Sequence, residues 1–255
     1  EKQKDLDDLL KGKCLFYTDP PKTVVEKLST AKVLYIYPDT FDQWTDILLF
    51  IHQKKSLPVK LMIFADSDIS LCNDHLDALF AFFGETEFWI QNWIGYHPRC
   101  TLLPLATSNY ITPVSVKKDQ LLGISFLNYY VGCKAREDFF SFLHSNPMIQ
   151  GNCFPKTTFQ DYCERVAKCE FHTCPMGEGY DTFRFWETLA LGTVPVVKDD
   201  YFYDCVAQQY PEIPMLRLGS WNDLDDLQNK DIPSIPHLPY LYKDYWVAKI
   251  KALLE

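Results

Sequence analysis

The segment CPMGEGYDTFRFWETLALGTVPVV, residues 174–197, holds the parts of an α/β unit in a row. An apolar strand ends at Cys-Pro, two glycines flank one glutamate, an amphipathic run carries one arginine and one glutamate, and Gly-Thr-Val-Pro-Val-Val closes the segment. Glycines between a strand and a helix permit a tight turn, and a short apolar run after the helix indicates a strand buried on both faces. The segment therefore predicts a parallel sheet covered by helices.

The same alternation continues outward from this segment in both directions. Short apolar runs separated by helical patterns are typical of βαβ units. Strands are predicted at residues 31–38, 59–66, 86–93, 100–106, 121–128, 170–175 and 193–198, and helices at residues 41–55, 74–85, 135–146, 155–169, 182–192, 221–228 and 242–255. The fold class is therefore expected to be α/β.

Two halves repeat this alternation, so we expect two domains facing each other across a cleft at the carboxyl ends of their strands. The boundary is expected in the polar stretch 108–120. The expected domains are residues 1–115 and residues 116–235. A final helix within 236–255 is expected to cross back to the first domain.

Composition excludes several classes of protein. The net charge of −9 over 255 residues argues against nucleic-acid binding, which requires a basic face. No apolar run approaches the roughly 18 residues of a transmembrane helix. The nine cysteines form no Cys-x-x-Cys pair, and no Asn-x-Ser/Thr acceptor occurs. These patterns favour a cytoplasmic protein without a transmembrane segment.

The opening segment also suggests an anion site. Backbone N–H groups at Gly177 and Gly179 can approach a ligand closely, and the start of the following helix favours negative charge. Arg184 in the first helical turn is unfavourable for the helix dipole, which points to a bound anion or a carboxylate partner. Glu187, one turn on, can accept hydrogen bonds from a ribose. A simple turn with an ordinary ion pair between Arg184 and Glu187 remains the alternative.

The whole segment is more specific than its spacing, and it resembles the donor-site signature of the exostosin family of glycosyltransferases. The matching residues are Cys174, Pro175, Gly177, Gly179, Asp181, Thr182, Arg184, Trp186, Glu187, Gly192, Pro195, Val196 and Val197. The resemblance extends upstream to FWIQNWIGYHPRCTLLPLA (88–106) and FPKTTFQDY (154–162), and covers roughly residues 60–200. In size the chain is similar to compact enzymes of large algal viruses.

The resemblance implies a GT-B architecture of two Rossmann-like domains, with residues 1–115 on the acceptor side and residues 116–235 on the donor side. It also implies a nucleotide-sugar donor and inversion at the anomeric carbon, with no metal or other cofactor. By resemblance the donor is a UDP-sugar, with UDP-xylose as the leading candidate, and the acceptor is a glycan hydroxyl, fucose being one candidate. The implied donor-binding residues are Arg136, Arg184, Glu187, Gly177, Gly179, Tyr180, Asp181, Thr158 and Phe159. Arg136 is chosen as a second cation because the leaving diphosphate gains negative charge.

An inverting displacement also needs a general base, which is expected from the first half. Asp66 and Asp68 follow the strand predicted at 59–66, and the compact relatives have a similar Asn-Ser-Asp there. Asp68 is favoured and Asp66 is second, although an aspartate at a strand end can also simply cap a turn. The other candidates are His75, His97 and His172.

Two further interpretations stay open. Asp66-Ser67-Asp68 also fits the Asp-x-Asp motif of GT-A glycosyltransferases, in which carboxylates hold Mn²⁺ or Mg²⁺ against a diphosphate. The other interpretation is a glycan- or nucleotide-binding module without catalysis, which the many aromatic side chains would suit. The long signature at 174–197 favours the metal-independent enzyme over both.

Overall fold

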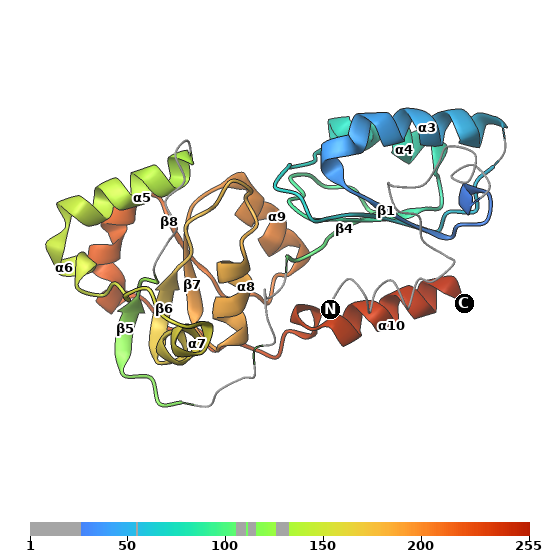
Figure 1. Ribbon diagram of the computed structural model, residues 1–255. Helices are drawn as coiled ribbons and strands as arrows, with labels where there is room; N and C mark the ends of the chain where they lie inside the picture. The colour runs from blue at the N-terminus through green and yellow to red at the C-terminus, as the bar shows by residue number, and fades with distance from the viewer. Residues whose placement is uncertain (1–26, 55, 106–110, 112–115, 126–132) are drawn as a thin grey trace. The chain divides into compact units, whose positions relative to one another are not determined.

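A computed structural model of the chain describes residues 27–54, 56–105, 111, 116–125 and 133–255 (Figure 1). The chain divides into two compact units. The first ends at Leu103 and takes in Trp246–Glu255, and the second is Pro104–Tyr245. The expected boundary after residue 115 falls at the edge of a segment outside the described residues. Each unit contains a parallel four-stranded sheet, which confirms the predicted α/β class.

The sheet of the first unit has the strand order β1-β2-β3-β4. Its elements are β1 Val33–Ile36, η1 Pro38–Thr40, α3 Phe41–Lys54, β2 Leu61–Phe64, α4 Asn73–Phe82, β3 Glu87–Ile90 and β4 Cys100–Leu102. Every strand pair is parallel. Because successive strands are neighbours and right-handed crossovers all move in one direction, α3 and α4 lie together on one face (Figure 1).

The opposite face of this sheet is covered by the end of the chain. Helix α10, Lys243–Leu254, places Ile250 in a core with Val33, Leu61 and other strand residues. Trp246 packs edge-on against Trp89, with ring centroids 5.1 Å apart. The sheet is therefore covered on both faces, as its apolar strands require.

The sheet of the second unit has the order β5-β6-β7-β8, again with all strands parallel. Its elements are β5 Gln120–Gly123, α5 Lys134–Ser145, α6 Pro147–Gln150, α7 Phe159–Ala167, β6 Cys169–Thr173, α8 Phe183–Ala190, β7 Val194–Lys198, α9 Tyr201–Gln209, β8 Leu216–Leu218, η2 Trp221–Asn229 and η3 Pro239–Leu241.

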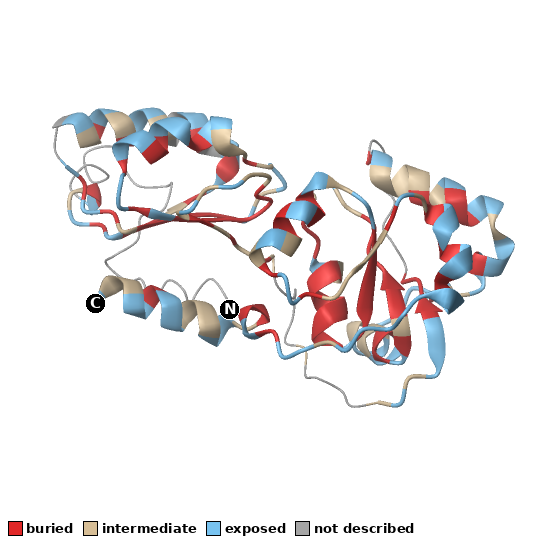
Figure 2. Cartoon of the chain, turned by 180° about the vertical axis from the view of Figure 1, so that it is seen from behind, coloured by how far each residue is buried: buried red, intermediate tan, exposed pale blue. Residues whose placement is uncertain are grey.

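Both faces of this second sheet are buried, and β6 and β7 are buried along almost their whole length (Figure 2). Phe171 packs into a core with Phe139 of α5 and Trp221 of η2. The ring centroids of Phe139 and Trp221 lie 4.6 Å apart. The next residue along β6, His172, faces the other side and bonds to Thr188 of α8. Successive residues of one strand thus serve two cores.

Some elements differ in detail from the sequence prediction. Residues 221–228, predicted to be helical, form the 3₁₀-helix η2, because Trp221, Leu224 and Leu227 recur every three residues and all are buried. In addition, α9 and β8 occupy a stretch for which the sequence predicted no element.

Among the helices of the described residues, none combines the length and hydrophobicity that crossing a membrane would require.

Candidate active site

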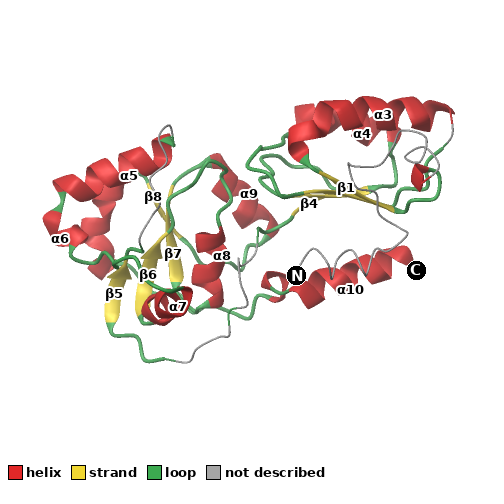
Figure 3. Cartoon of the chain, in the orientation of Figure 1, coloured by secondary structure: helices red, strands yellow, loops and turns green. Residues whose placement is uncertain are grey.

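The glycine-containing loop of residues 174–182, here called the glycine loop, joins the carboxyl end of β6 to α8 (Figure 3). The side chain of Thr182 caps α8, since it accepts a hydrogen bond from Phe185 N at 3.4 Å. The capping hydroxyl sets the direction in which the glycine loop enters α8.

Asp181 points into the protein. Its carboxylate accepts hydrogen bonds from the indole N–H of Trp186 at 2.5 Å and from Leu105 N at 2.8 Å. Burial raises the pKa of Asp181 to about 7, although these N–H donors and the backbone of Thr182 pull it down. These contacts indicate that Asp181 holds the glycine loop in place, and they do not favour a direct contact of its carboxylate with a nucleotide-sugar donor.

Arg136, near the start of α5, lies against the glycine loop. Its Nε donates to the carbonyl of Met176 at 3.3 Å. A Cβ atom on Gly177 would lie 3.1 Å from Arg136 Nη2, so only glycine leaves the guanidinium its present place. The thiol of Cys133 donates to the carbonyl of Gly177 at 3.1 Å. The fold therefore brings two sequence-predicted residues, Arg136 and Gly177, together.

The rest of the glycine loop is enclosed to different degrees. Gly179 is buried, and its carbonyl oxygen lies 3.9 Å from the position of a Cβ on Gly177. Tyr180 is half-buried and stacks on Phe202 of α9, with ring centroids 6.1 Å apart and 23° between the planes. This stacking holds the Tyr180 ring of the glycine loop against α9.

Helix α8 carries the predicted cation and carboxylate. Arg184 is half-buried, whereas Glu187 is only 5% exposed. Both act on Tyr162 of α7: burial raises the pKa of its phenol well above the usual range, the charge of Glu187 raises it further, and the charge of Arg184 lowers it. The two α8 side chains therefore lie at the side of the sheet that α7 covers.

Two of the implied donor-binding residues, Thr158 and Phe159, lie at the start of α7. Thr158 is the N-cap, accepting from Asp161 N at 3.2 Å while its hydroxyl donates to the Asp161 carboxylate at 2.9 Å. Thr157 donates to the same carboxylate, and these hydrogen bonds lower the pKa of Asp161. The ring of Phe159 packs beside that of Tyr162, with ring centroids 5.8 Å apart. Thr158 thus caps α7, while Phe159 lies beside the ring that adjoins Glu187.

In the first unit, Asp66 and Asp68 follow the carboxyl end of β2, and both are exposed. Asp66 has a positive φ of 66°, and its carboxylate accepts a hydrogen bond from the hydroxyl of Tyr35. The carboxylate of Asp68 accepts no hydrogen bond from any residue that the structure describes. The two aspartates are therefore in different states: one is held by a phenol and the other faces solvent.

The three candidate histidines are all engaged. His75 caps α4, where its Nδ1 accepts a backbone N–H. His97 stacks on Phe80 at 3.9 Å, and burial lowers its pKa. His172 is fully buried, its Nδ1 lies 2.8 Å from the hydroxyl of Thr188, and burial followed by the charge of Arg184 lowers its pKa well below the usual range. These contacts favour structural roles.

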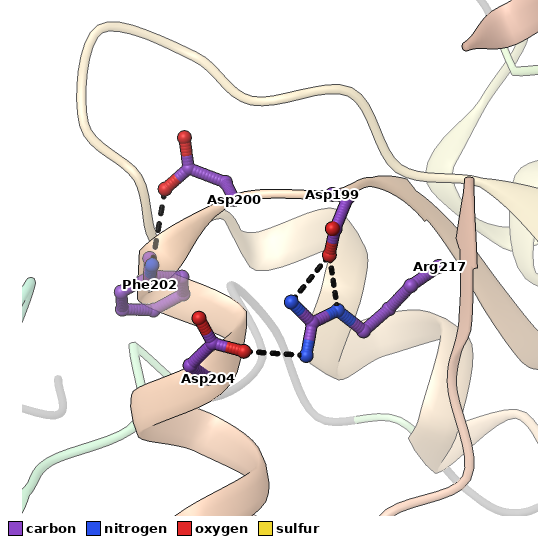
Figure 4. Close-up of polar contacts among 5 residues, drawn as sticks. All are labelled: Asp199, Asp200, Phe202, Asp204 and Arg217. Atoms are coloured by element: carbon purple, nitrogen blue, oxygen red, sulfur yellow. Dashed lines mark hydrogen bonds and ion pairs between the residues drawn. The ribbon is translucent and has the colours of Figure 1, made fainter. Parts of the chain in front are cut away.

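A further arginine of the second unit, Arg217, is paired with carboxylates (Figure 4). Its Nε donates to Asp199 at 2.6 Å, and its Nη1 lies 2.8 Å from a carboxylate oxygen of Asp204. Asp200 caps α9 by accepting from Phe202 N at 3.0 Å. The guanidinium of Arg217 is thus neutralised locally by two carboxylates.

Several residues with a place in these sites were not singled out from the sequence. Tyr162 and Cys133 meet the site through packing that no local pattern indicates. Gln91 and Asn92 bond to the backbone of the Asp66–Asp68 loop, and their sequence signal was the Gln-Asn pair within the resembling stretch. Among the described residues, no three His, Cys, Asp or Glu side chains gather as ligands for a metal ion.

Comparison with known families agrees with this geometry. Residues 148–231 match the family model described as the RXYLT1 C-terminal domain, which represents an exostosin-like xylosyltransferase family. The matched stretch lies within the second unit and includes the glycine loop and α8. No curated protein matches the chain. The family match supports an exostosin-like glycosyltransferase, an enzyme class that takes a sugar donor and a glycan acceptor.

Proposed function

We propose that this chain is an inverting glycosyltransferase of GT-B architecture that transfers a sugar from a UDP-sugar to a hydroxyl of a glycan acceptor. The observation that carries the proposal is the contact of Arg136 with the glycine loop, and that loop lies within the stretch that the family model matches. A guanidinium beside backbone N–H groups and a helix start is suited to a diphosphate.

In the proposed donor complex, Arg136 and Arg184 bind the diphosphate together with the N–H groups of Gly177 and Gly179. Preorganised cations stabilise the charge that develops on the leaving UDP, and they require no reorganisation during the reaction. Tyr180 lies beside the diphosphate or the sugar.

Glu187 accepts hydrogen bonds from the ribose hydroxyls, and Phe159 forms a wall for the base. The place of Glu187 supports this role, because it lies on α8 one turn beyond Arg184 and beside Tyr162 of α7. Thr158 supports the same pocket through the α7 cap.

The proposed reaction is a single displacement. Asp68 removes the proton from the acceptor hydroxyl while the hydroxyl oxygen attacks the anomeric carbon of the donor sugar. At the same time the bond between the anomeric carbon and UDP breaks, and UDP leaves. The exposed carboxylate of Asp68, which accepts no hydrogen bond from the described residues, is suited to this step, whereas Asp66 is held by Tyr35. We propose xylose as the transferred sugar, in line with the xylosyltransferase family matched, and fucose as a candidate acceptor by resemblance to the viral enzymes.

The alternative is a metal-dependent GT-A-type enzyme that uses Asp66-Ser67-Asp68. The exposure of both carboxylates at a strand end favours it, since an Asp-x-Asp site would hold a metal together with oxygens of the diphosphate.

The deciding experiment is a panel of nucleotide sugars, followed by donor hydrolysis and thermal shift, with and without excess EDTA. The proposal predicts that UDP-xylose stands out and that EDTA leaves its turnover unchanged. Activity only with Mn²⁺ or Mg²⁺ would establish the GT-A alternative. Binding of a nucleotide without turnover, with any acceptor, would indicate a non-catalytic binding module.

A further inference from the structure

Two buried side-chain amides follow β3 and bond to the loop that carries the candidate base. Gln91 is 7% exposed and Asn92 is 1% exposed. The Oε1 atom of Gln91 accepts a hydrogen bond from Asp66 N at 2.7 Å, and Nδ2 of Asn92 donates to the carbonyl of Ser67 at 2.9 Å. Both amides thus use a hydrogen bond on the backbone of the neighbouring loop.

The backbone at this edge has an unusual conformation. Among the described non-glycine residues, only Asp66 and Asn92 have positive φ, at 66° and 50°. Residues other than glycine rarely adopt positive φ, and aspartate and asparagine are among those that tolerate it best. The hydrogen bonds of the two side-chain amides hold the loops after β2 and β3 in this conformation, because rotation of the backbone at Asp66 would withdraw its N–H from Gln91.

The side chains of Asp66 and Ser67 in this loop are also held by hydrogen bonds. The hydroxyl of Tyr35 donates to Asp66, the hydroxyl of Ser67 donates to Asp39, and Ile69 N donates to the Ser67 hydroxyl at 3.0 Å. Asp68 lies between these anchored positions, and its exposed carboxylate is bonded to no described residue. The loop is therefore rigid around one carboxylate that remains available.

We propose that Gln91 and Asn92 are positioning residues for Asp68, an inference that rests on the proposed function. A general base must lie within hydrogen-bond reach of the acceptor hydroxyl. Buried amides are costly to leave unbonded, so they lock the loop in a single place at the edge of the sheet. A displacement of 1 Å in a reacting group can lower a rate by about 100-fold.

The test compares Asn92→Gly and Gln91→Met with Thr86→Val. Glycine keeps access to positive φ and removes only the amide, and methionine keeps the length of Gln91 without its acceptor oxygen. Thr86 is the matched control: it is equally buried and donates to the carbonyl of Val59 at 2.7 Å, but it precedes β3 and so lies at the opposite end of the same sheet.

The two amide variants are expected to lose kcat by about 10- to 100-fold while KM for UDP-xylose and the affinity for UDP stay unchanged. Thr86→Val is expected to lower the melting temperature and to keep kcat. If Asn92→Gly does not fold, Gln91→Met and Ser67→Ala test the same loop.

The outcomes separate this inference from the proposed function. Wild-type protein without transfer, or Asp68→Asn with full turnover, would overturn the function or the base, and this inference with it. If Asp68→Asn abolishes turnover while Asn92→Gly and Gln91→Met keep the wild-type kcat, the positioning role alone is wrong. An equal loss of kcat in Thr86→Val would likewise reduce the effect to general stability.

Discussion

Arg136 and Gly177 touch: the space that a Cβ atom on the glycine would occupy lies 3.1 Å from Nη2 of the arginine. The same guanidinium donates through Nε to the carbonyl of Met176. The arginine near the start of α5 and the loop after β6 are therefore in contact within the second unit.

The first prediction concerns Gly177→Ala. The added methyl group would displace the Arg136 guanidinium by a few tenths of an ångström, because the contact is tighter than ordinary packing allows. The affinity for UDP is expected to fall several-fold, measured by calorimetry, with little change in melting temperature. Gly84→Ala is the control, because a Cβ there would meet nothing within 4 Å. Equal UDP affinities in the two variants would contradict the role of this contact.

Arg184→Ala should weaken UDP binding and lower turnover together. A hydrogen bond to a charged group contributes about 1.5–3 kcal/mol, so the loss of affinity should be about 10- to 100-fold. Arg217→Gln serves as the comparison, because it removes an arginine of the same unit that pairs with Asp199 and Asp204. It should leave UDP affinity intact. Unchanged binding in Arg184→Ala would remove Arg184 from the donor site.

Asp68→Asn should leave UDP affinity unchanged while turnover falls by about 10²- to 10⁴-fold, the usual contribution of a general base. Asp66→Asn should cost less, since asparagine tolerates positive φ and can still accept from Tyr35. The measurement is kcat with saturating donor and acceptor. The reverse order of the two losses would assign the base to Asp66.

The carboxyl group of Asp181 should make stability depend on pH. Folding raises its pKa from 3.8 to about 7, chiefly through burial, so between these values the folded chain holds a proton that the unfolded chain has lost. Its contribution to the free energy of unfolding is therefore full at low pH and is lost as pH rises toward 7, by at most about 1.4 kcal/mol per pH unit.

Asp181→Asn isolates this effect, because asparagine stays neutral throughout. Denaturant titrations across the same pH range should show the advantage of the wild type over the variant shrinking as pH rises. Parallel stability curves for the two proteins would mean that Asp181 is ionised in the folded state.

Local patterns in the sequence were sufficient for the α/β class, for most strands and helices, and for grouping Gly177, Arg184 and Glu187 on one strand–loop–helix unit. These features depend on the period of apolar residues and on neighbours within a few positions, which the chain displays directly. The helix predicted at residues 221–228 is present, but its 3₁₀ type was not predicted, because a spacing of three fits both helix types until packing selects one.

Only the tertiary structure decided which distant residues meet. Arg136 reaches the glycine loop because β5 and β6 are neighbours, and Asp181 faces inward because Trp186 and Leu105 offer it donors there. Gln91 and Asn92 hold the Asp66 loop because β2 and β3 end at one edge of a parallel sheet. Such contacts depend on strand order and register, which are set by the packing of the whole sheet and leave no periodic signal in any single segment.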